Sequence, residues 1–207
     1  MQVACGISIE RRCGLADPLR ALRAGDAIIV VDVQIDFCPG GALPIEGGDA
    51  VVAVLNRWIE AASQAGVPVY ASRDWHPARH LSFRESGGQW PSHCLQDSEG
   101  ARFHPALRLP GSTVLVTKGV RFDRDQYSAF DETGLARELR RAGVRRVWIG
   151  GLAQDVCVRA TVLDARREGF ETTVIADATR PVTRDGGIEA TGEMRQAGAR
   201  FETTELS

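Results

Sequence analysis

The chain has 207 residues, of which 43% are hydrophobic and 25% are charged, and its formal net charge at pH 7 is -2. A chain of this length can bury a full hydrophobic core as one domain, and its composition excludes a mainly disordered protein. Because basic and acidic residues nearly balance, nothing in the charge favours nucleic acid as a partner. No apolar run reaches the roughly 18 residues that a membrane span needs, so we expect no membrane partner.

The first 25 residues differ from the rest and are expected to form an N-terminal extension, in which 18–25 could form one or two helical turns. Their apolar patch precedes their arginines, whereas a secretory signal has its charge first. We therefore expect a cytoplasmic protein with free thiols rather than a disulfide framework. The cysteines are Cys5, Cys13, Cys38, Cys94 and Cys157.

From Asp26 onward, strand and helix patterns alternate. Short β-branched apolar runs predict buried parallel strands, and segments with apolar residues at helical spacing predict helices, several of them ending at a glycine. In chain order we expect a strand (27–32), a helix (50–66), strands (67–72 and 112–119), a helix (135–143), a strand (144–151), a helix (155–169), a strand (170–177), a helix (188–198) and a strand (199–205). This order predicts an α/β domain over residues 26–207, with three α/β/α layers and a mostly parallel six-stranded sheet.

Three polar residues with complementary chemistry lie at or just after the ends of predicted strands, where ligands of such sheets bind. They are Asp32, Lys118 and Cys157. Cys157 opens a helical pattern, and both the helix dipole and the free N–H groups there would lower the pKa of a thiol and hold an oxyanion. Together the three supply a nucleophile, a base and a charge stabiliser. On these residues alone, a buried structural cysteine and an ion pair between Asp32 and Lys118 remain alternatives.

The polar stretch 73–112 contains Asp74 and every histidine of the chain, namely His76, His80, His93 and His104. Irregular connections longer than about 15 residues are usually functional. One carboxylate with two or three imidazoles suits Zn, Fe or Mn, so we expect a divalent metal there. The alternative is a solvated loop whose histidines cap turns. Phe37 and Trp90 flank this site and could hold a flat ring, although such aromatics are more often part of the core.

Six segments, in order and at sensible spacing, together resemble the nicotinamidases of the isochorismatase-like cysteine hydrolase superfamily. They are VVDVQIDFCPGGALP (30–44), SRDWHPARHLSF (72–83), WPSHC (90–94), VTKG (116–119), YSAFD (127–131) and GLAQDVCVRATVLDA (151–165). The resemblance runs from about residue 26 to the C-terminus, and it implies the isochorismatase-like, Rossmann-like hydrolase fold.

The resemblance implies a catalytic triad of Cys157, Asp32 and Lys118. It also implies a cis peptide bond between Leu152 and Ala153, before the turn that carries the nucleophile. The backbone N–H groups of Ala153 and Cys157 would then form the oxyanion hole.

For the metal, the resemblance implies Asp74, His76 and His93 as ligands, with His80 either a fourth ligand or a neighbour of the others. Zinc is the first choice, and iron or manganese stay open. Phe37 and Trp90 correspond to the aromatic positions that bind the substrate ring.

The implied activity is metal-dependent hydrolysis of nicotinamide to nicotinate and ammonia through a cysteine thioester, with pyrazinamide as a further substrate. The implied role is NAD salvage, a branch of pyridine nucleotide biosynthesis, and homo-oligomerisation stays open. The alternatives are another cysteine amidohydrolase of the superfamily, acting on carbamoyl or ureido amides, and a non-catalytic binding protein of this fold. Isochorismate hydrolysis needs no thiol, so Cys157 counts against it.

The sequence departs from the pattern of the family at two positions, Ile35 where Asn is common and Gln154 where Thr is common. Neither position supplies the triad, so these departures bear on the detail of the substrate.

Overall fold

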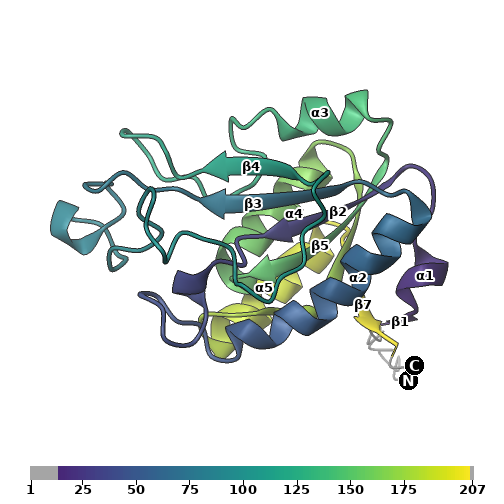
Figure 1. The fold of residues 1–207 in the computed structure, drawn as a ribbon, viewed down its shortest axis with the longest axis horizontal. Helices are drawn as coiled ribbons and strands as arrows, with labels where there is room; N and C mark the ends of the chain where they lie inside the picture. The colour runs from purple at the N-terminus through teal and green to yellow at the C-terminus, as the bar shows by residue number, and fades with distance from the viewer. Residues whose placement is uncertain (1–13, 206–207) are drawn as a thin grey trace, which may run out of the picture.

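A single sheet of seven strands runs through the computed structural model, which describes residues 14–205 (Figure 1). The strands are β1 (Gly14–Ala16), β2 (Asp26–Val31), β3 (Val69–Asp74), β4 (Val114–Lys118), β5 (Arg146–Leu152), β6 (Glu171–Arg180) and β7 (Arg200–Thr204). Their order across the sheet is β1-β7-β6-β5-β2-β3-β4. Each pair of neighbouring strands is parallel, which confirms the predicted sheet type.

The predicted number of six strands is wrong by one, because β1 was not expected. This strand has three residues and pairs with β7 in parallel, Gly14 lying opposite Glu202. So short a strand has no detectable period in the sequence. It is followed by the short helix α1 (Pro18–Ala21), so the described part of the expected N-terminal extension packs onto the main sheet. Residues 1–13, including Cys5 and Cys13, lie outside the described part of the chain.

Helices cover both faces of the sheet, as a three-layer α/β/α arrangement requires (Figure 1). Besides α1 they are α2 (Val51–Ala65), α3 (Leu135–Arg141), α4 (Arg159–Arg167) and α5 (Arg184–Gln196). Helix α2 ends at Gly66, which adopts the left-handed conformation expected of a C-cap (φ 66°). Helix α5 begins four residues earlier than predicted, because the Thr183 side chain accepts a hydrogen bond from the Gly186 N–H and caps it. None of the helices in the described range is long and apolar enough to cross a membrane.

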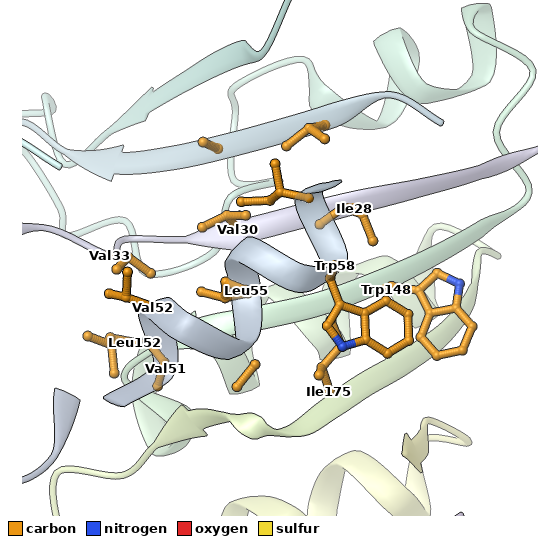
Figure 2. Packing of buried hydrophobic residues seen from close by; sticks show 14 of the residues in the cluster. Ile28, Val30, Val33, Val51, Val52, Leu55, Trp58, Trp148, Leu152 and Ile175 are labelled. Carbon is orange, nitrogen blue, oxygen red and sulfur yellow. The ribbon is translucent and has the colours of Figure 1, made fainter. Parts of the chain in front are cut away.

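The core is built around β2, whose six residues are all buried. Alternate side chains point to opposite faces, so Ile28 and Val30 pack toward α2 (Figure 2). Ala27, Ile29 and Val31 pack on the other face, with residues of α3, α4 and α5. On the α2 face, the rings of Trp58 and Trp148 lie 4.7 Å apart. The Trp58 indole N–H donates to Thr204 Oγ1, so its polar atom is satisfied inside the core. At its carboxyl end, β2 is held between two neighbours, because Val31 is paired with Gly151 of β5 and with Ser72 of β3.

The strand order reverses between β2 and its neighbour β5. From β2 the chain moves outward to β3 and β4 and then returns on the other side to β5, β6 and β7. Ligand sites in such sheets lie outside the carboxyl ends of the strands at this switch point. The irregular stretch between β3 and β4 folds over the same edge, with Trp90 bridged to Phe83 and Leu95 to His76.

Candidate active site

The structure brings Asp32, Lys118 and Cys157 together at the carboxyl edge of the sheet. Lys118 Nζ lies 2.8 Å from Asp32 Oδ2 and 3.5 Å from Cys157 Sγ. The Asp32 carboxylate and Cys157 Sγ lie within 4.8 Å of one another. Asp32 and Lys118 are completely buried, so their charges meet in an environment where electrostatic interactions are stronger than in water.

Asp32 is aimed by backbone conformation and by a serine on the next strand. Its φ of 48° turns the chain away from β2 immediately after the last paired residue. Ser72 Oγ donates to Asp32 Oδ1 at 2.7 Å, and the Asp32 N–H donates to the Ser72 carbonyl oxygen. Sequence reasoning missed Ser72. The signal was its place two residues before Asp74 on β3, since alternate strand residues share one face.

The protonation states in this cluster follow from burial and from the central ammonium. Burial raises the pKa of Asp32 to about 6, although Lys118 acts in the opposite sense. Burial also raises the pKa of the Cys157 thiol well above its ordinary value, and Lys118 offsets this only in part. The sequence-based expectation of a lowered thiol pKa is therefore wrong for this structure, because desolvation outweighs the dipole of the helix. The resting arrangement is a neutral thiol beside a carboxylate and an ammonium group.

Cys157 lies in a π-helical turn, Gln154–Val158, that leads into α4. A cis peptide bond joins Leu152 to Ala153 directly before this turn, as the resemblance implies. The Asp155 carboxylate accepts the Val182 N–H at 2.8 Å and so ties the turn to the segment before α5. Gln154, one of the two departures, makes a second tie because its Nε2 donates to Thr191 Oγ1 at 2.8 Å.

Asp74, His76 and His93 form a buried group whose potential ligand atoms all lie within 4.8 Å of one another. His76 Nδ1 lies 2.9 Å from the Gly119 carbonyl oxygen, and His93 Nδ1 lies 2.8 Å from that of Pro91. Both imidazoles can therefore donate through Nδ1 and present Nε2 to a cation, the arrangement typical of histidine ligands. One carboxylate and two imidazoles fit a divalent zinc, iron or manganese ion.

Asp74 also belongs to the charge cluster around Lys118, because Lys118 Nζ lies 2.6 Å from its Oδ1. Although burial opposes ionisation, Lys118 and His76 hold the pKa of the Asp74 carboxyl well below its usual range. The ammonium group of Lys118 is thus shared by the carboxyl groups of Asp32 and Asp74.

His80 lies beside this group rather than within it. It is completely buried, and its Nδ1 is 2.7 Å from Ser82 Oγ. Its potential ligand atoms cluster with those of His76 and Asp125 instead of those of Asp74 and His93. His80 Nε2 has no hydrogen-bond partner among the described residues, and its ring lies 4.4 Å from that of His76, so both roles, a fourth ligand or a neighbour of the ligands, stay open. Asp125 was missed by sequence reasoning, and its signal was its place between VTKG and YSAFD, two of the recognised segments.

A mostly apolar pocket connects the thiol with the group of potential metal ligands. Phe37 and Trp90, the two aromatics expected to hold a ring, both line it. Trp90 is oriented by Tyr127, whose hydroxyl oxygen accepts the indole N–H at 3.1 Å. The other lining residues are Leu43, Pro44, Ile45, Asp74, His76, His93, Asp125, Tyr127, Ala153, Val156, Cys157 and Val182. Such a pocket suits a small flat ring that carries polar atoms at both ends.

Residues 26–205 match the family model of the Isochorismatase domain. The chain is 38% identical over 200 residues to the nicotinamidase of Escherichia coli (strain K12), covering 86% of this chain and 94% of the relative. The crystal structure of a Pyrococcus horikoshii pyrazinamidase in complex with zinc superposes with a TM-score of 0.84 at 43% identity, covering 86% of this chain and 99% of that one. A structure of PnC1 from L. infantum in complex with nicotinate gives a TM-score of 0.81 at 35% identity, over 94% and 100% of the two chains. Since the family model spans the whole sheet from β2 to β7 and the relatives are matched over nearly their full length, the chain belongs to the Isochorismatase domain family.

Proposed function

We propose that the chain is a metal-dependent nicotinamidase, which hydrolyses nicotinamide to nicotinate and ammonia and also accepts pyrazinamide, as a step of NAD salvage. One observation carries the proposal: a single apolar pocket is lined by the Cys157 thiol, which lies against Lys118 and Asp32, and by three side chains suited to a divalent metal. A pyridine carboxamide needs a nucleophile at its carboxamide and a partner for its ring nitrogen. The names of the related nicotinamidases and pyrazinamidase support the same assignment.

Catalysis begins with transfer of the Cys157 proton to Asp32, whose pKa of about 6 suits a group that must both accept and return a proton near neutral pH. The Lys118 ammonium stabilises the thiolate as it forms. The thiolate attacks the carboxamide carbon, and the backbone N–H groups of Ala153 and Cys157 are proposed to hold the resulting oxyanion.

Breakdown of this tetrahedral intermediate requires Asp32 to give up the proton that it took from Cys157. Asp32 gives it to the amide nitrogen, the C–N bond breaks, and ammonia leaves behind a thioester on Cys157. A water molecule then loses a proton to Asp32 and attacks the thioester. The proton returns to the sulfur as the C–S bond breaks, which restores the thiol and releases nicotinic acid, and the acid loses its remaining proton to solvent as nicotinate.

Asp74, His76 and His93 would hold the metal ion, which would supply a Lewis-acid partner for the pyridine nitrogen. The side chains of Phe37 and Trp90 bind the two faces of the ring and exclude water from it. Because the ring is rigid, a substrate bound at both ends has its carboxamide carbon placed for attack by the sulfur.

The pH dependence of kcat/KM should report the ionisation of Asp32. Only the carboxylate can accept the thiol proton, so the rate should rise about tenfold per pH unit below pH 6 and level off above it. A profile of ammonia release between pH 4.5 and 8 measures this. An Asp32→Asn variant is the control, since its residual rate should lose the acidic limb. An unchanged limb in that variant would assign the titration to another group.

Two rival functions are weakened by the same site. Amidohydrolases acting on carbamoyl or ureido amides share the triad but usually lack the Asp-x-His…His set, which this chain places in a buried cluster. A non-catalytic binding protein would have no need for a buried thiol beside a carboxylate and an ammonium group, since such burial is unfavourable unless the groups are used.

A series of four ring amides tests the proposed substrate. Nicotinamide and pyrazinamide carry a ring nitrogen meta to the carboxamide, benzamide lacks it, and picolinamide has it in the adjacent position. We expect kcat/KM for benzamide and picolinamide to be at least about tenfold lower, because neither can place a nitrogen on the metal while its carbonyl carbon meets the sulfur. Benzamide turnover within about threefold of nicotinamide would favour the broader amidase function instead.

A further inference from the structure

Gln34 is a completely buried glutamine whose whole amide group is used to hold the backbone of Asp74. Its Oε1 accepts the Asp74 N–H at 2.8 Å. Its Nε2 donates to the Asp74 carbonyl oxygen at 2.8 Å and to the Ala101 carbonyl oxygen at the same distance. All three contacts go to main-chain atoms more than 39 residues away, and both N–H groups and the oxygen of the Gln34 amide have a partner.

The Gln34 amide takes the place of a peptide group in the sheet. Strands β2 and β3 are paired as far as Val31 and Ser72, and the positive φ of Asp32 then carries the backbone of β2 away. Beyond this point, the Gln34 side chain both accepts from and donates to Asp74, as a neighbouring strand would. On its other side Asp74 is paired with Lys118 of β4. Asp74 is thereby held from both sides, like a residue in the middle of a sheet.

This contact joins the two halves of the site. Gln34 lies two residues after Asp32, and its N–H donates to the Asp32 carbonyl oxygen at 2.8 Å. The short segment from Asp32 to Gln34 therefore includes the carboxylate of the triad. Through the Gln34 amide, the same segment also fixes the position of Asp74, one of the three side chains suited to a metal. The separation between thiol and metal depends on where Asp74 lies relative to Asp32, and a rigid substrate bound at both ends is sensitive to that separation.

We infer that Gln34 is a specificity-determining positioning residue, which sets the span between the triad and the metal and so selects amides whose ring nitrogen can bridge it. This inference rests on the proposed function. It predicts that a change at Gln34 affects bridging substrates much more than a substrate that is held only at the carboxamide end. A residue that merely supported the fold would lower all rates by the same factor.

The test is Gln34→Met, which keeps the length of the side chain and removes its three hydrogen bonds. We expect kcat/KM for nicotinamide to fall by about 30-fold or more, kcat/KM for benzamide to change by less than about threefold, and their ratio to fall by about tenfold. Alkylation of Cys157 by iodoacetamide should stay within about threefold of wild type, because the triad is intact. The affinity for Zn²⁺, measured by competition with a chelating dye, should fall by about tenfold or more.

The matched control is Asn56→Leu, which removes a comparable pair of side-chain hydrogen bonds to the main chain in another part of the molecule. Asn56 Oδ1 accepts the Arg108 N–H, and its Nδ2 donates to the Ala106 carbonyl oxygen. This variant should leave both the substrate ratio and the Zn²⁺ affinity unchanged. If Gln34→Met does not fold, Gln34→Asn, which retains the amide but shortens its reach, is judged by the same measurements.

The outcomes separate this inference from the proposed function. An unchanged ratio of nicotinamide to benzamide in a folded Gln34 variant would overturn the positioning role while leaving the nicotinamidase proposal intact. Absence of nicotinamide turnover in the wild type would overturn the proposed function. In that case a loss of Zn²⁺ affinity in Gln34→Met but not in Asn56→Leu would still support the positioning of Asp74 and would remove only the claim about substrate choice.

Discussion

Cys157→Ala should lower kcat for nicotinamide by about four orders of magnitude or more, while the fold and the affinity for metal remain those of the wild type. The thiol is the group proposed to form the covalent intermediate, and its Sγ lies 3.5 Å from Lys118 Nζ in a fully buried cluster. Alanine leaves no nucleophile, and removal of the central member of a catalytic group typically has effects of this size. Removing Sγ opens only a small space in the pocket wall, so stability should change little.

The measurement is single-substrate ammonia release, with circular dichroism and Zn²⁺ affinity measured on the same sample. Cys38→Ala is the matched control, since Cys38 is also a buried free thiol but does not line the pocket. Its rate should remain within about threefold of wild type. A Cys157→Ala enzyme that retained more than about a tenth of the wild-type rate would contradict covalent catalysis through this residue.

Lys118→Met should reduce both stability and activity, with a loss of about 3 to 5 kcal/mol in the free energy of unfolding. Its ammonium group is completely buried and lies 2.8 Å from Asp32 and 2.6 Å from Asp74. Without it, buried Asp32 loses its compensating charge and Asp74 keeps only His76, and the pKa of Asp32 should rise further because one of the influences that lowers it is lost. At neutral pH less of Asp32 would then be ionised, so kcat/KM should fall by about 1,000-fold.

Urea denaturation measures the stability, and ammonia release by the folded protein measures the activity. Arg146→Met is the control, because Arg146 forms a partly buried pair with Asp26 at the opposite end of β2 from the site. That variant should also lose stability but keep its kcat/KM per folded molecule. If Lys118→Met were as stable as wild type to within about 1 kcal/mol, the buried charge cluster could not have the energetic role described here.

Much of the fold is predictable because its signals are local. The apolar run Ala27–Val31 and the glycine at Gly66 reveal a buried strand and a helix end from the sequence alone, and both are where they were expected. The three-residue β1 has no such signal, since its hydrogen bonds depend on β7, far away in the chain. The strand order across the sheet is likewise a property of long-range pairing.

The candidate site shows the same division. Asp32, Lys118 and Cys157 were identified because each is an unusual polar residue after a strand, and parallel topology brings strand ends together. Ser72 and Gln34 were missed because each acts through a partner about 40 residues away. The thiol pKa was judged from the helix that follows Cys157, whereas its direction is decided by burial, which is a property of the whole fold.

The interior position of β2 in the sheet also has a consequence for how the protein is made. One of its two neighbours, β5, pairs with it across 120 residues, as Asp26 and Arg146 illustrate. A ribosome that has completed β2, β3 and β4 has therefore produced an apolar strand with one edge still unpaired. Until β5 emerges, that edge can pair with another nascent chain. Early binding by a chaperone would protect this strand from pairing with another chain. The protection matters most during synthesis at high yield, because the long loop between β2 and β5 closes slowly.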